Sequence, residues 1–283
     1  MERRRGSDGV RITGEISSPR NEKLKALRQL RKRTYRKRER KFLVEGLKGV
    51  EEALKSENPP HLIACTKQGL ERLELLSQLV EARRTPVYLL TEEAMLSVTT
   101  TVTPPGILAV TSFMDQSLGQ LLEFEPSIIL FADRVRDPGN MGNLIRIADA
   151  AGIGGVVVGK ESVDIYNPKT VRSSAGSIFH VPHCVDVSLE ECAPLLKERG
   201  YSLLVADPHK GVSYWETEWP ERTVLVVGNE AWGYPEEEFI PADGYVSVPI
   251  FGKAESLNVS VAAALIIYEA KRRGTRSLEV KER

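Results

Sequence analysis

The second half of the chain contains four short, strongly apolar runs that are rich in β-branched residues. They lie at 128–131, 156–158, 203–205 and 224–227, and a segment with helical spacing at 144–151 separates the first two. Runs this short and uniformly apolar are typical of strands that are buried on both faces, and strands that alternate with helices form parallel sheets. We therefore predict an α/β domain with a parallel sheet over residues 126–283. Its last helix begins near Asn258 and ends at Gly274.

The first half alternates in the same way. Strand-like runs lie at 42–44, 61–65, 86–90 and 107–110, and helix-like segments at 47–55 and 70–80. This pattern predicts a smaller α/β domain over residues 16–112, joined to the second domain by a linker at 113–125. Residues 1–15 are polar and charged, so we expect a basic, disordered arm there.

Charge is distributed very unevenly along the chain. The whole chain has a formal net charge of +0. Residues 1–41 hold 16 Lys or Arg and 5 Asp or Glu, a net charge of +11, so the remaining 242 residues sum to −11. A basic segment on a more acidic body attracts phosphates without regard to sequence. The partner that this charge pattern favours is a nucleic acid.

The basic segment also has helical periodicity. Leu24, Leu27 and Leu30 share one face, and Asn21 or Ser18 can cap the helix start. A solvated charged face is the plainer interpretation, but the net charge of +10 over residues 20–41 favours RNA contact. The candidate RNA-binding residues are Arg28, Arg31, Lys32, Arg33, Arg36, Lys37 and Arg38.

Composition narrows the class of protein. The chain is 41% hydrophobic and 28% charged, as in globular proteins, and no apolar run approaches the ~18 residues that span a bilayer. The start, Met-Glu-Arg-Arg-Arg, does not resemble a secretory signal. Three cysteines without ligand spacing indicate neither a disulfide framework nor a zinc site, which favours a reducing cytoplasm. His180 and His183 have no third ligand nearby in the sequence, so we expect no metal.

Three polar blocks each follow an apolar run of the second half. The first covers residues 133–143 and precedes Arg146, the second covers 228–235, and the third covers 248–260. Taken singly, they are consistent with a strand–helix loop, an acidic turn and a helix cap. Open parallel sheets bind ligands at the carboxyl ends of their strands, so their common placement predicts one binding site.

These blocks resemble the three motifs of the SpoU/TrmH family of RNA ribose 2′-O-methyltransferases, in the SPOUT superfamily. Residues 137–142 (DPGNMG) with Arg146 are similar to motif one, and 228–230 (GNE) to motif two. Residues 248–250 (VPI) with 256–262 (SLNVSVA) are similar to motif three, and 169–177 (KTVRSSAGS) to another common segment. The resemblance covers roughly residues 126–273. The preceding domain resembles the ribosomal-protein-like RNA-binding domain that is often found in this family.

The resemblance implies a fold, a cofactor and an assembly. We expect the C-terminal α/β domain to contain a deep trefoil knot, which no general rule of chain topology would suggest. We expect S-adenosylmethionine in that knot, a homodimer formed through this domain, and no role for a membrane. The cofactor-binding positions correspond to Gly228, Val248, Ile250 and Leu257, and the catalytic positions to Asn140, Arg146, Glu230, Ser256 and Asn258.

The expected reaction is methylation of a ribose 2′-hydroxyl in ribosomal RNA, with the 23S species favoured and transfer RNA as the second choice. A guanidinium rarely loses its proton, so Arg146 is expected to orient the ribose and stabilise developing negative charge. One alternative is a non-catalytic RNA-binding protein of ribosome assembly. A dinucleotide-dependent oxidoreductase is disfavoured because the G-x-G-x-x-G turn is missing.

Overall fold

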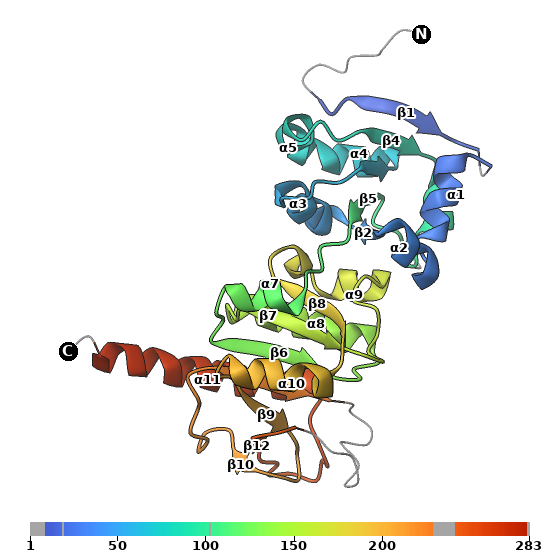
Figure 1. Cartoon of the computed structure of the whole chain (residues 1–283). Helices are drawn as coiled ribbons and strands as arrows, with labels where there is room; N and C mark the ends of the chain where they lie inside the picture. The colour runs from blue at the N-terminus through green and yellow to red at the C-terminus, as the bar shows by residue number, and fades with distance from the viewer. Residues whose placement is uncertain (1–8, 19, 102, 229–240, 282–283) are drawn as a thin grey trace. The chain divides into compact units, whose positions relative to one another are not determined.

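The computed structural model describes residues 9–18, 20–101, 103–228 and 241–281, with side chains described up to residue 274. The chain forms two compact units (Figure 1). Unit 1 comprises the chain up to Met114 together with Tyr166–His180, and unit 2 comprises Asp115–Ile165 and the chain from Val181 onward. The segment 166–180, which the sequence assigned to the second domain, therefore packs as part of unit 1.

Unit 1 contains a mixed five-stranded sheet in the order β1-β4-β3-β5-β2. The strands β1, β4 and β3 are parallel, and β5 is antiparallel to both β3 and β2. The strands are β1 (Ile12–Ile16), β2 (Lys41–Glu45), β3 (Leu62–Cys65), β4 (Val87–Leu90) and β5 (Ile107–Ser112). The helices are α1 (Glu22–Gln29), α2 (Arg33–Glu39), α3 (Leu47–Lys55), α4 (Lys67–Leu73), η1 (Glu74–Leu76), α5 (Ser77–Ala82), α6 (Glu92–Val98), α9 (Pro168–Ser173) and η2 (Ser177–Phe179).

Strand β1 corrects one expectation. We expected residues 1–15 to be disordered, yet Ile12–Ile16 pairs in parallel with β4, and the side chain of Ile16 is buried. The expectation was therefore wrong for residues 12–15, while residues 1–8 lie outside the described part of the chain. Backbone pairing with a strand more than 70 residues away orders this polar segment, and local sequence does not report such a partner.

The basic segment forms two helices where we expected one. The side chain of Asn21 accepts a hydrogen bond from the amide of Lys23 and caps α1. The apolar face is confirmed, because Leu24, Leu27 and Leu30 are all buried in the unit 1 core. The chain then turns before α2 begins at Arg33.

Arg36 corrects the set of predicted RNA contacts. Its side chain is only 2% exposed, and its Nη1 donates to the carbonyl oxygens of Leu30 and Arg31, each at 2.8 Å. These carbonyls lie just after the last residue of α1, Gln29, and need a donor because no further helical turn supplies one. Arg36 therefore joins α2 to the end of α1, and we remove it from the RNA-binding residues.

Segment 166–180 is fixed to unit 1 by aromatic and ionic contacts. The ring of Tyr166 stacks on Phe113 at 3.9 Å, and its hydroxyl accepts a hydrogen bond from the amide of Met114 at 2.8 Å. In α9, Arg172 pairs at 3.4 Å with Glu45, whose side chain is almost fully buried. A buried carboxylate needs such a partner, so these contacts are specific to this segment.

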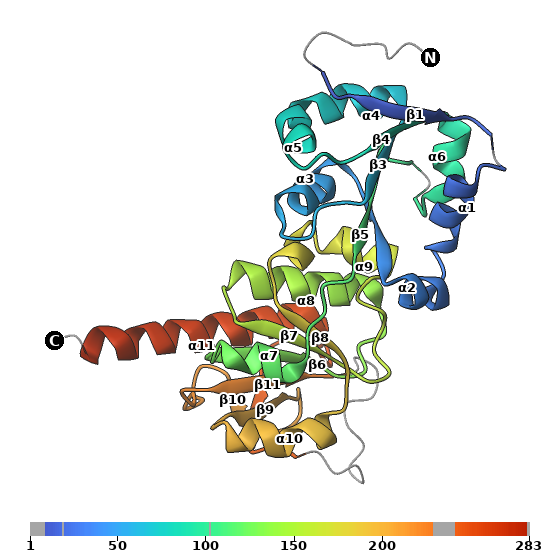
Figure 2. The same cartoon turned by 45° about the horizontal axis from the view of Figure 1, so that its top comes forward.

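Unit 2 contains a seven-stranded sheet in the order β10-β12-β9-β11-β6-β7-β8, and every neighbouring pair in it is parallel. The parallel sheet predicted from the apolar runs is confirmed. The strands are β6 (Ile128–Ala132), β7 (Gly155–Gly159), β8 (His183–Val187), β9 (Ser202–Ala206), β10 (Val212–Ser213), β11 (Thr223–Val227) and β12 (Gly244–Ser247). The helices are α7 (Leu118–Glu123), α8 (Pro138–Ala150), α10 (Leu189–Glu198) and α11 (Val259–Lys281), and Figure 2 shows them around the sheet.

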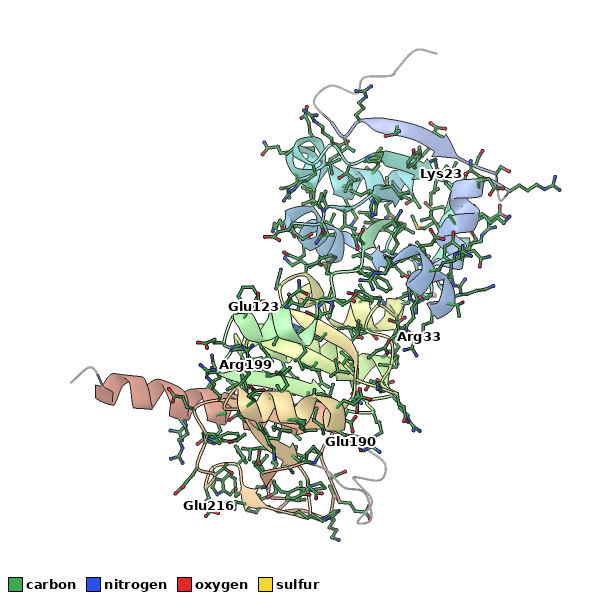
Figure 3. All side chains as sticks on the ribbon, in the orientation of Figure 1. Lys23, Arg33, Glu123, Glu190, Arg199 and Glu216 are labelled. Atoms are coloured by element: carbon green, nitrogen blue, oxygen red, sulfur yellow. The ribbon has the colours of Figure 1, made fainter. Side chains whose placement is uncertain are left out.

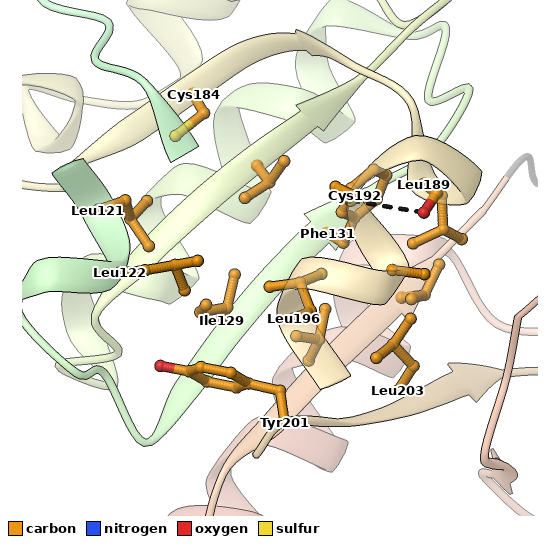
Figure 4. Close-up of a cluster of buried hydrophobic side chains, with 14 of the residues drawn as sticks. Leu121, Leu122, Ile129, Phe131, Cys184, Leu189, Cys192, Leu196, Tyr201 and Leu203 are labelled. Carbon is orange, nitrogen blue, oxygen red and sulfur yellow. Dashed lines mark hydrogen bonds between the residues drawn. The ribbon is translucent and has the colours of Figure 1, made fainter. Parts of the chain in front are cut away.

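Helices cover both faces of this sheet. One face packs against α7 and α10 in a cluster that includes Phe131, Leu196 and Leu203 (Figure 4). The other face packs against α8 and α11, which also contact each other. Burial raises the pKa of the Cys184 thiol to about 12 and that of the Cys192 thiol to about 11, so both remain protonated and unreactive.

Helix α11 is longer than predicted. It continues through Gly274 to Lys281, whereas we expected it to end at Gly274 (Figure 1). A glycine inside a helix costs about 1 kcal/mol relative to alanine, and good helix formers on either side offset that cost. The predicted start near Asn258 is confirmed.

Candidate active site

The described parts of the three polar blocks lie at the carboxyl edge of the unit 2 sheet. Strands β6 and β11 are neighbours, with Ala132 opposite Val227. Just beyond the strand ends, the amide of Asp133 donates to the carbonyl of Val227 at 2.9 Å. The start of the first block therefore lies beside Gly228, the start of the second. Strand β12, which precedes the third block, joins the same parallel sheet through β9.

Helix α8 begins earlier than the sequence predicted. Its first residue is Pro138, and the side chain of Asp137 accepts a hydrogen bond from the amide of Asn140 at 2.9 Å. Proline fits the first helical position because no amide hydrogen is needed there. This cap puts Asn140 in the first turn, where its side chain is buried.

A side-chain hydrogen bond joins the first and third blocks. Nδ2 of Asn258 donates to Oδ1 of Asn140 at 2.9 Å. Oδ1 of Asn258 accepts from the amide of Ser260 at 3.0 Å and from its hydroxyl at 2.6 Å. Asn258 thus caps α11 with its oxygen and binds α8 with its nitrogen, so both of its polar atoms are used. The starts of the two helices are fixed to each other at the edge of the sheet.

The predicted cofactor positions and Ser256, a predicted catalytic position, lie near this edge. Gly228, Val248 and Ile250 are half-buried after β11 and β12, while Ser256 and Leu257 are exposed before α11. Glu230 lies outside the described residues.

Arg146 is not brought together with the asparagine pair. It is the ninth residue of α8, in the third turn, whereas Asn140 lies in the first. Its side chain is exposed, and within the described part of the chain it has no hydrogen bond or ion pair. Its guanidinium is therefore accessible to a ligand.

The sequence analysis did not single out two acidic residues of this edge as site residues. Asp207 follows β9, is buried, and accepts hydrogen bonds at Oδ1 from the amides of His209 and Lys210. Asp133 follows β6 and pairs with Arg134 at 3.0 Å. The available signal was the same in both cases, an aspartate directly after an apolar run.

The candidate RNA-binding surface of unit 1 lies along α1 and α2. Arg31, Lys32, Arg33, Lys37 and Arg38 are all exposed there. In Figure 3, the labelled Lys23 on α1 and Arg33 at the start of α2 mark this part of the unit.

Arg28, the remaining predicted contact, is half-buried on α1. Its Nε donates to the hydroxyl of Ser97 at 3.0 Å. That bond fixes its orientation on the surface.

Comparison with known proteins identifies the family. The family model described as the SpoU rRNA Methylase family matches residues 127–268, and a model described as the MRM3-like substrate binding domain matches residues 21–109. The chain is 37% identical to the 23S rRNA (guanosine(2553)-2′-O)-methyltransferase of Bacillus subtilis over 91% of this chain and 99% of that protein. The chain belongs to the SpoU rRNA methylase family. The family resemblance inferred from the three motifs is confirmed.

Solved structures of the family share the fold over most of the chain. The AdoMet-bound rRNA methyltransferase of Sinorhizobium meliloti matches with a TM-score of 0.79 and 28% identity, over 92% of this chain and 97% of that one. An RNA 2′-O ribose methyltransferase matches with a TM-score of 0.77 and 31% identity, over 93% of this chain and 99% of that one.

The described part of the chain offers neither a metal site nor a membrane-spanning helix. Among the described residues, no group of three or more His, Cys, Asp or Glu side chains is placed to hold a metal ion. Of the helices in the described ranges, none is long and apolar enough to cross a membrane.

The asparagine pair gives a prediction for the variant Asn258→Asp. Aspartate keeps the oxygen that caps α11 but lacks the donor to Asn140, and it places a carboxylate against the oxygen of that residue. We expect the melting temperature to stay within a few degrees and methyl transfer to RNA to fall at least roughly ten-fold. Thermal unfolding and a labelled-methyl assay measure the two effects, and normal transfer would exclude the pair from the site.

Proposed function

We propose that the protein transfers the methyl group of S-adenosylmethionine to a ribose 2′-hydroxyl of ribosomal RNA. The observation that carries this proposal is the bond between Asn140 of motif one and Asn258 of motif three, at the sheet edge where Gly228 begins motif two. Membership of the SpoU rRNA methylase family supplies the class of reaction.

The residues present fit S-adenosylmethionine. Gly228 directly follows β11, Val248 directly follows β12, and Ile250 lies two residues further on; all three are half-buried at the edge where parallel sheets bind ligands. They would hold the cofactor together with Leu257. When bound, S-adenosylmethionine supplies an activated methyl group on a sulfonium. The structures of relatives from Sinorhizobium meliloti and Streptomyces viridochromogenes are described as AdoMet-bound, which supports this assignment.

Arg146 is proposed to orient the acceptor ribose. A guanidinium has a pKa above about 12, so it acts through its positive charge and its N–H donors and does not remove a proton. Its exposed position on α8 gives an RNA ligand access. Holding the hydroxyl in line with the methyl group can lower the barrier by several kcal/mol. The site around the acceptor ribose is proposed to be shaped by four further residues, Asn140, Glu230, Ser256 and Asn258.

Ribosomal RNA is favoured over transfer RNA as the substrate. The similar protein from Bacillus subtilis is named for 23S rRNA, and the similarity covers nearly all of both chains. We infer a 23S-type substrate, and with it a cytoplasmic location. Transfer RNA remains the second candidate because a similar Synechocystis protein is described as a tRNA/rRNA methyltransferase.

The test is transfer of labelled methyl from S-adenosylmethionine to 23S rRNA, to ribosomal subunits and to transfer RNA. We expect label on one ribose of ribosomal RNA with the wild-type chain. Arg146→Ala should lose at least roughly a thousand-fold in turnover, because its charge stabilises the reacting oxygen, while cofactor affinity stays within about two-fold. Isothermal titration measures that affinity.

Two results would contradict this assignment. Near-normal turnover by Arg146→Ala would remove this residue from the reaction. A wild-type chain that binds RNA but not S-adenosylmethionine would support the alternative of a non-catalytic assembly protein.

We also propose that the exposed cations of α1 and α2 bind RNA phosphates. Deleting residues 1–41 would remove β1 and the buried leucines of α1, so substitution is the cleaner test. Lys32→Gln with Arg33→Gln should lower the slope of log affinity against log salt by about two, since each phosphate contact contributes about one. Lys67→Gln with Arg84→Gln removes two exposed charges elsewhere in unit 1 and should leave the slope unchanged. If the two double variants had equal salt slopes, the RNA interface would not lie at Lys32 and Arg33.

We further propose a homodimer formed through α11, and a trefoil knot in unit 2. Val261, Leu265 and Tyr268 lie on one side of α11 and are 48%, 39% and 53% exposed. A contiguous apolar stripe of this kind indicates a protein interface.

The proposed trefoil knot has a separate support. Helix α11 returns from β12 to pack on α8 and β11.

The stripe predicts the effect of a charge at its centre. Leu265→Glu should convert a dimer to a monomer in sedimentation velocity, because an unpaired carboxylate is costly to bury. Phe124→Glu, at an exposed position after α7, is the control and should not change the sedimentation. A wild-type chain that already sediments as a monomer would contradict the proposal.

A further inference from the structure

Arg134 has a constrained position at the end of β6. Its backbone φ is +51°, in the left-handed region that a side-chain-bearing residue adopts only at an energetic cost. Its Nε donates to Oδ2 of Asp133 at 3.0 Å, and its side chain is 24% exposed. The guanidinium is thus oriented by a carboxylate but still reaches the surface.

The residues on both sides of Arg134 are fixed. The amide of Asp133 binds the carbonyl of Val227 in β11. A Cβ on Gly159 would lie 2.9 Å from Oδ1 of Asp133, so a glycine is needed to leave room for the carboxylate. On the other side, the hydroxyl of Ser162 accepts from the amide of Val135 and donates to the carbonyl of Ala132, each at 3.1 Å. Strain that is held by so many contacts is a feature of functional sites.

We propose that Arg134 binds a phosphate of the RNA beside the methylated ribose. Every ribose within an RNA chain is flanked by phosphates, so an enzyme that reacts at a ribose has an anion at a fixed distance to use for positioning. A guanidinium has five N–H donors in a planar fork, which lets it bind a carboxylate and a phosphate together. Arg134 lies where the strands before motifs one and two end side by side.

This inference rests on the proposed function of the sheet edge as the reaction site. A purely structural pair, in which Arg134 only neutralises Asp133, is the competing explanation. The two differ in salt dependence, because a residue that contacts a phosphate releases counterions on binding and an internal ion pair does not.

The chain offers a matched control for this test. Arg222 pairs with Glu125 at 3.2 Å, is 32% exposed, and directly precedes β11 at the opposite edge of the same sheet. Arg134→Gln and Arg222→Gln each remove one arginine that pairs with a carboxylate. Arg134→Lys retains the charge and serves as the conservative variant if Arg134→Gln lowers stability.

The experiment measures binding of full-length protein to unmodified, transcribed 23S rRNA at several salt concentrations. Affinity for S-adenosylmethionine is measured separately by calorimetry. For Arg134→Gln we expect roughly ten-fold weaker RNA binding and a salt slope lower by about one, with cofactor affinity within about two-fold. Arg134→Lys should restore the slope, and Arg222→Gln should match the wild type.

An unchanged slope for Arg134→Gln, or a loss equal to that of Arg222→Gln, would assign Arg134 to structure alone. A selective loss of S-adenosylmethionine affinity would assign it to the cofactor carboxylate and would also overturn the proposal. These binding results do not depend on turnover. Failure of the proposed function would instead be seen as a wild-type chain that transfers no methyl group.

Discussion

The parallel arrangement of the unit 2 sheet is the constraint on which the candidate site depends. In a fully parallel sheet all strands end at the same edge, so loops that are far apart in the sequence must emerge together. The pairing of β6 with β11 places Asp133 against Val227 by this means. The bond between Asn140 and Asn258 then fixes the starts of two helices that are more than a hundred residues apart.

Charge alone did not distinguish the roles of the basic residues in unit 1. Arg33 and Arg36 lie three positions apart in one basic run, yet the first is exposed and the second is buried against helix carbonyls. Both lie on α2, but Arg36 reaches the carbonyls of Leu30 and Arg31 that follow the last residue of α1. A buried arginine of this kind completes backbone hydrogen bonds that the end of a helix leaves open.

Several features could be predicted because they depend on local sequence. The apolar runs predicted β6, β7, β9 and β11, and the leucine spacing predicted the buried face of α1. Other features depend on partners that are distant in sequence. Strand β1 exists because it pairs with β4, and segment 166–180 joins unit 1 through Glu45 and Phe113. No local pattern reports contacts of this range.

The sequence by itself determined the class of fold, the three motifs and the family, because short apolar runs and fixed motif spacings are local properties of the chain. Only the tertiary structure decided which of these residues meet. It joined Asn140 to Asn258, left Arg146 exposed on α8, and oriented Arg134 with Asp133 in a space that Gly159 leaves open. The physical reason is that strand order and helix packing set these distances, and both are fixed by contacts between segments far apart in the chain.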